Sequence, residues 1–147
     1  MDFETKVKLQ IYQTVAKTTK LPSASYIAAA LNAEPDDVRR AFISLHQKRL
    51  LVPEPGDPDH IRMASPFSGI PTDFPVHINN KIYYANCSWD SLAVPAALHE
   101  DGEIRAKDAF SGEPIVIEVK KGRPIERECV FHFAVPAALW WNDIIYT

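Results

Sequence analysis

The chain has 147 residues, of which 46% are hydrophobic and 24% charged, the composition of an ordinary globular protein with one domain or two small ones. No apolar run approaches the length that spans a bilayer, which excludes a transmembrane helix and gives no membrane partner. The net charge of −3 provides no general attraction to nucleic acid. The first residues lack the apolar core of a secretory signal, so we expect a cytoplasmic protein.

Three short helices are expected in the first third of the chain. Apolar spacing predicts a helix over residues 3–17, Ser23 or Ser25 can cap a second helix that ends near Asn32, and a third runs from about residue 34 to residue 48. Two short strands follow around the turn in PEPGDPDH. This order is that of a winged helix, so a winged-helix-like helical module is expected over residues 1–66.

A winged helix suggests DNA binding, but the charges of this one argue against it. Phosphates could be contacted by the basic residues in and after the third helix, which are Arg39, Arg40, Lys48 and Arg49. The presumed wing is acidic, with Glu54, Asp57 and Asp59, and would repel a phosphate backbone. We therefore expect an accessory module and no nucleic-acid partner.

The second half changes character after a proline-rich linker at residues 65–82. The expected order is strand, helix, three strands and helix, in the segments KIYYAN, SWDSLAVPAAL, EIRAKDAF, PIVIEVKKG, CVFHFAV and PAALWWNDIIY. This order predicts an α+β domain over residues 67–147, with a small, mostly antiparallel sheet and flanking helices. The whole chain is thus expected to be α+β, with the winged-helix module first.

The segment YYANCSWDSLAVPAAL places a thiol and a carboxylate at the start of a predicted helix. If the helix begins at Ser88, Cys87 lies at its N-cap and Asp90 in its first turn. Unpaired N–H groups and the helix dipole stabilise a thiolate there, so the pKa of Cys87 is expected to be lowered. Asp90 can then act as an acid beside a nucleophilic or metal-binding sulfur. The alternative is a buried, inert Cys87, with Asp90 only stabilising the helix start.

Other candidate residues have weaker patterns. Cys129 is the second of two cysteines, and both are expected to be free thiols in a reducing compartment. No recognisable signature surrounds the histidines that could serve as a base, which are His77, His99 and His132. No CxxC or HxxxH spacing indicates zinc. The tryptophans could line an apolar pocket or could occupy more ordinary core and interface positions. They are Trp89, Trp140 and Trp141.

Together these segments resemble the alkylmercury lyases, or organomercurial lyases. YYANCSWDSLAVPAAL is similar to the family's active-site segment, in which a Tyr-Ala-x-Cys-x-x-Asp run precedes an apolar helix containing proline. AKDAFSGEPIVIEV resembles the family's next strand–turn–strand unit, and ECVFHFAVPAALWW resembles the strand that carries a second essential cysteine. The family also has a winged helix ahead of its catalytic domain, so the resemblance covers most of the chain.

The resemblance implies that Cys87, Asp90 and Cys129 catalyse protonolysis of a carbon–mercury bond in a small organomercurial. Cys87 and Cys129 would bind the mercury, and Asp90 would lie at the metal and protonate the leaving carbon. No separate cofactor is required. The product Hg(II) would stay on the two sulfurs until exogenous thiols remove it.

The sequence departs from the family pattern in two places. Asp108 stands near the position of a further, structural cysteine, and family members are expected to continue past WWNDIIYT with another strand and helix. Two other functions stay open. One is a metal- or redox-responsive winged-helix regulator, and the other is a non-catalytic relative that binds thiophilic metals.

Overall fold

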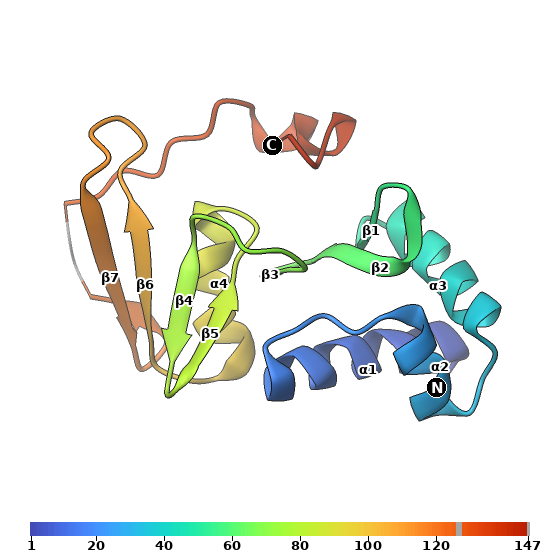
Figure 1. Cartoon of the computed structure of the whole chain (residues 1–147). Helices are drawn as coiled ribbons and strands as arrows, with labels where there is room; N and C mark the ends of the chain where they lie inside the picture. Colours follow the sequence, from blue (N-terminus) through green and yellow to red (C-terminus); the bar gives the residue numbers. More distant parts are fainter. Residues whose placement is uncertain (126–127, 147) are drawn as a thin grey trace.

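The computed structural model describes residues 1–125 and 128–146 and is of the α+β class (Figure 1). The first half contains three helices followed by a three-stranded antiparallel sheet, in the order β1-β2-β3. Its elements are α1 (Phe3–Thr18), α2 (Ala24–Leu31), α3 (Pro35–Gln47), β1 (Val52–Glu54), β2 (Asp57–Ala64) and β3 (Phe67–Ser68). This arrangement of three helices and a hairpin is the one expected, whereas the winged-helix assignment and the boundary at residues 66 and 67 stay predictions.

The second half is built on a five-stranded antiparallel sheet in the order β5-β4-β6-β7-β8. One helix, α4, packs on β4 and β6. The elements are β4 (Pro75–Ile78), β5 (Lys81–Tyr84), α4 (Ser88–Leu98), β6 (Gly102–Lys107), β7 (Pro114–Lys120), β8 (Arg123–Pro124) and the 3-10 helix η1 (Ala137–Asn142). The expected linker at residues 65–82 therefore already contains β3, β4 and the start of β5, with Asn79 in the left-handed conformation at the turn.

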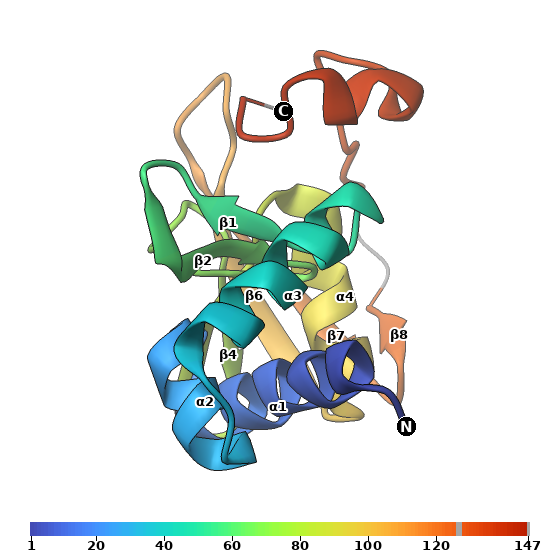
Figure 2. The same cartoon turned by 90° about the vertical axis from the view of Figure 1, so that its right-hand side faces the viewer.

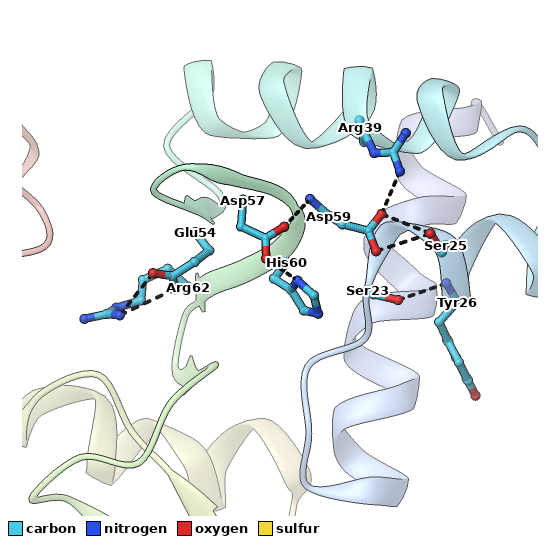
Figure 3. A network of polar contacts seen from close by, with 9 residues as sticks. All are labelled: Ser23, Ser25, Tyr26, Arg39, Glu54, Asp57, Asp59, His60 and Arg62. Carbon is cyan, nitrogen blue, oxygen red and sulfur yellow. Dashed lines mark hydrogen bonds and ion pairs between the residues drawn. The ribbon is translucent and has the colours of Figure 1, made fainter.

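Ion pairs within the first half occupy most of the basic residues that the sequence offered as possible phosphate contacts. Asp59 accepts hydrogen bonds from Arg39 (3.0 Å) and from Ser25 (3.0 Å), which ties the β1–β2 hairpin to α2 and α3 (Figure 3). Arg40 pairs with Asp37 on α3. Lys48 pairs with Glu4 on α1 at 2.6 Å and Arg39 also with Asp36, which leaves Arg49 without an ion pair to any described residue.

Phe67 joins the two halves of the molecule. It is 2% exposed, and its ring lies 6.3 Å from that of Tyr12 on α1 and 5.9 Å from that of Tyr83 on β5. The Tyr83 hydroxyl donates a hydrogen bond to the Ala16 carbonyl (2.8 Å), and Val15 is buried in the core of the second half. Helix α1 thus contributes side chains to the hydrophobic cores of both halves. Figure 2 shows the same fold turned by 90°.

The expected strand CVFHFAV is wrong, because residues 128–133 form no strand. Phe131 packs against the core under the five-stranded sheet, whereas Val130 is 93% exposed. The two-residue strand β8 pairs with Val119 and Lys120 at the end of β7, and this apolar segment pairs with no described strand. The expected last helix is present only as the 3-10 turn η1.

Within the described ranges, no helix combines the length and the apolar character needed to cross a bilayer.

Phe67→Ala is expected to lower the free energy of unfolding by about 3–5 kcal/mol, because it removes a buried ring shared by both halves. Phe110→Ala makes the same change at a fully exposed ring and should cost less than about 0.5 kcal/mol. Urea denaturation followed by circular dichroism measures both. Equal effects of the two substitutions would contradict a joining role for Phe67.

Candidate functional site

Cys87 lies at the N-cap of α4, where the sequence placed it. The chain leading to it is held by hydrogen bonds from residues 66–74, since the carbonyl of Ala85 accepts from Thr72 Oγ1 (2.6 Å) and the amide of Ala85 donates to Phe74 (3.1 Å). The Cys87 carbonyl accepts the first bond of the helix, from the Ser91 amide at 3.0 Å. The Cys87 side chain forms no capping hydrogen bond by geometry, although the amides of Asp90 and Trp89 lie near enough to the sulfur to favour the thiolate.

Asp90 lies in the first turn of α4 and is partly buried. Asn86 donates a hydrogen bond from Nδ2 to Asp90 Oδ2 at 2.8 Å. Burial raises the pKa of Asp90, and the Asn86 hydrogen bond opposes this by stabilising the carboxylate. The net effect is a carboxyl group that keeps its proton to higher pH than an ordinary aspartate.

The expected lowering of the Cys87 pKa is wrong, because burial raises the pKa of this thiol. The amide N–H groups of Asp90 and Trp89 act in the expected direction, but they are weaker than desolvation, and the charge of Asp90 raises the pKa further. A helix N-terminus stabilises a thiolate only where water or partners compensate for the loss of solvent. The site is therefore a thiol beside a protonatable carboxyl group.

Cys87 and Asp90 open into a largely apolar cleft of about 650 Å³. Both halves of the chain line it. The first half contributes Arg49, Leu50, Leu51, Val52, Met63 and Ser65, and the second contributes Phe74, Asn86, Cys87, Ser88, Asp90, residues 132–135, Trp140, Trp141 and residues 144–146. Such a volume is typical of sites for small organic ligands.

Two of the three tryptophans, Trp140 and Trp141, line this cleft. The sequence had left open whether the tryptophans line a pocket or occupy core positions. Trp141 lies against His46 of α3, with ring centroids 5.9 Å apart, and Trp140 lies 5.2 Å from Phe133. Trp89 faces solvent instead and is 58% exposed. The aromatic walls come from the C-terminal segment that follows the sheet.

His132 also lines the cleft, whereas the sequence placed it in the expected strand CVFHFAV and gave no signature that set it apart from His77 and His99. The signal that misled was the β-prone pattern around it, which placed it on a strand that does not form. His77 and His99 do not line the cleft. Asp108 accepts hydrogen bonds from the amides of Phe110 (3.0 Å) and Ser111 (2.6 Å), so it shapes the turn between β6 and β7.

Cys129 is exposed and is not among the residues that line the cleft. Within residues 1–125 and 128–146, no group of three or more His, Cys, Asp and Glu side chains is placed to hold a metal ion. The structure thus brings Cys87 and Asp90 together and leaves Cys129 exposed, outside the cleft lining.

Comparison with known proteins identifies the relatives of this chain. The family model for the MerB alkylmercury lyases matches residues 67–147, more than half of the chain. A solved structure described as the mercury-bound form of MerB2 has the same fold, with a TM-score of 0.62 and 24% identity. That alignment covers 81% of this chain and 58% of the other, so this chain spans less than two thirds of its length. No curated protein matches.

Cys129 is expected to react with iodoacetamide several-fold faster than Cys87 at neutral pH, because Cys129 is exposed and burial raises the pKa of the Cys87 thiol. Peptide mass spectrometry after timed labelling measures the two rates. In urea the rates should converge. Faster labelling of Cys87 in the folded protein would contradict its burial.

Asp90→Asn is expected to raise the free energy of unfolding at pH 7 and to change it little at about pH 4. Because the folded-state pKa of Asp90 is raised, the wild type is favoured below the unfolded-state pKa and loses stability as pH rises through the folded-state pKa. Urea denaturation at several pH values measures the difference.

Asp108→Asn provides a control of opposite sign. Backbone N–H groups lower the pKa of Asp108, so its stabilising effect is present at neutral pH and is lost as pH falls through the folded-state pKa. This substitution should destabilise the protein at pH 7. The same sign for both variants would contradict the assigned environments.

Proposed function

Because the chain belongs to the alkylmercury lyase family, we propose that it cleaves carbon–mercury bonds by protonolysis, with Cys87 binding the mercury and Asp90 delivering the proton. The observation that carries the proposal is the placing of this thiol and this protonatable carboxyl group in one apolar cleft. The similarity to a mercury-bound MerB2 structure is consistent with it.

The first step is capture of the substrate by Cys87. Mercury(II) is soft and binds sulfur strongly, so an R–Hg–X compound exchanges its ligand X for the Cys87 sulfur, and the thiol proton leaves with X. A raised thiol pKa does not prevent this exchange, since the metal replaces the proton. It does keep the unoccupied site neutral in an apolar cleft.

Cleavage requires a second electron donor and an acid. We assign the donor to Cys129, whose thiol releases its proton to solvent and whose thiolate adds to mercury and weakens the carbon–mercury bond. The Asp90 O–H then transfers its proton to carbon, the electrons of the broken bond form the new C–H bond, and R–H leaves. Hg(II) remains on sulfur, and Asp90 takes a new proton from solvent.

Cys129 must approach the cleft to act in this way, because it lies outside the cleft lining. Residues 128–133 carry no ladder hydrogen bonds, so their displacement breaks no sheet. An external thiol could supply the second sulfur instead, and external thiols are expected to remove Hg(II) in either case. The position of Cys129 also favours a second candidate function, in which Cys87 binds mercury without cleaving its bond to carbon.

The direct test is incubation with phenylmercury acetate and excess thiol, with benzene measured by gas chromatography. Cys87→Ser should fall to the uncatalysed background, and Asp90→Asn should lose roughly 100-fold or more, as expected for a general acid. A wild-type rate equal to that of Cys87→Ser would overturn the lyase proposal.

Benzene release by the wild type separates cleavage from binding alone, and Cys129→Ser tests the assigned second sulfur. Loss of benzene release with retained binding of one mercury per chain supports the role of Cys129. An unchanged rate at several thiol concentrations would exclude that role and leave the external thiol as the second donor. Cys129→Ser leaves the cleft lining intact, so binding should persist in either case.

A further inference from the structure

Arg49 occupies an unusual position at the end of α3. Its backbone is left-handed, with φ of 59°, and the bonds from the Arg49 amide to His46 (2.8 Å) and from the Leu50 amide to Leu45 (2.9 Å) form a Schellman motif. Glycine is the usual residue there, because it adopts this conformation without strain. The last carbonyls of α3 are satisfied by backbone amides, so the guanidinium is not needed to cap them.

The Arg49 side chain lines the cleft and is not paired with any described residue. The arginines Arg39, Arg40, Arg62 and Arg105 are instead each paired with a carboxylate. Asp90 is the acidic residue in the cleft lining, and its hydrogen-bond donor is Asn86 (2.8 Å) rather than Arg49. A permanent positive charge on an exposed side chain thus lines a cleft whose other walls are mainly apolar and aromatic.

We propose that the cleft selects organic groups that carry a carboxylate, which Arg49 binds while the aromatic walls hold the rest of the molecule. The proposal rests on the lyase function above and names its substrate class, aryl- or alkylmercurials with an anionic substituent. The planar guanidinium binds a carboxylate through two parallel hydrogen bonds, which gives orientation as well as affinity. Trp140 and Trp141 provide flat surfaces for the organic part.

The same carboxylate chemistry could come from the thiol that removes mercury rather than from the substrate. Many small thiols are carboxylates, and one bound at Arg49 would lie in the cleft that holds Cys87. The two sources differ in which step they accelerate. A substrate carboxylate changes KM for the organomercurial, whereas a thiol carboxylate changes the dependence of turnover on thiol concentration.

A binding experiment tests the proposal without turnover. Benzoate and its neutral counterpart benzamide are titrated into the whole protein, and the indole N–H signals of Trp140 and Trp141 are followed by two-dimensional NMR. Benzoate is expected to bind about tenfold more tightly than benzamide in the wild type, and this preference should vanish in Arg49→Gln. Equal binding of both probes, or a preference that survives in Arg49→Gln, would overturn the proposal.

Three further variants separate recognition from folding. Arg49→Gly relieves the left-handed strain and should be at least as stable as the wild type, yet should lose the preference for benzoate. Arg49→Lys keeps the positive charge but lacks the guanidinium that binds a carboxylate through two hydrogen bonds, so it should retain part of the preference for benzoate. Arg123→Gln removes an exposed arginine outside the cleft and should change nothing. Loss of the preference in Arg123→Gln would mean that the charge of the whole protein, not Arg49, attracts benzoate.

Kinetics then distinguish failure of this proposal from failure of the lyase function. KM for 4-(hydroxymercuri)benzoate should rise about tenfold in Arg49→Gln, while KM for phenylmercury stays the same. No cleavage of either compound by the wild type refutes the lyase function alone, because the NMR result still decides the role of Arg49. A changed response to thioglycolate but not to cysteamine, with KM unaltered, would assign Arg49 to the thiol and overturn the substrate class.

Discussion

The contact of Phe67 with Tyr12 and Tyr83 is the constraint on which the site depends. It holds α1 against β5, and a bridge between Phe67 and Ala85 fixes the backbone two residues before Cys87. The end of α3 and the start of β1 are thereby kept opposite the N-terminus of α4. Each half has its own hydrophobic core, and this aromatic packing, together with the hydrogen bond from Tyr83 to Ala16, joins the two halves that line the common cleft.

The chemistry of the cleft follows from the water that this packing excludes. A carboxylate at the first turn of an exposed helix gains from the dipole and ionises readily. Asp90 occupies that position, but burial dominates, and the hydrogen bond from Asn86 only moderates its effect. Burial of Asp90 costs stability at high pH, where the carboxyl group must ionise. The same burial favours the protonated form, which can transfer its proton. Such opposition between stability and reactivity is common at functional sites.

The first half of the chain contributes to the cleft more clearly than to a DNA-binding surface. Its basic residues Arg39, Arg40 and Lys48 are paired with acids of the same module, whereas Arg49 extends from the helix end into the cleft lining. Helix α3 also contacts the C-terminal segment through His46 and Trp141. The module therefore forms one wall of the candidate site, which is a role that its own sequence pattern does not indicate.

Local rules in the sequence determined the three N-terminal helices, the hairpin, the start of α4 and the neighbourhood of Cys87 and Asp90, because residues three apart in a first helical turn must lie together. Family resemblance named Cys129, but only the tertiary structure placed it on an exposed segment, where the β-prone run around it pairs with no described strand. Tertiary structure also raised the pKa of Cys87, where the sequence predicted a lowered one. It also brought Arg49, His132 and two tryptophans around one cleft. Desolvation and enclosure depend on atoms from distant parts of the chain, and no local pattern encodes which of them will meet.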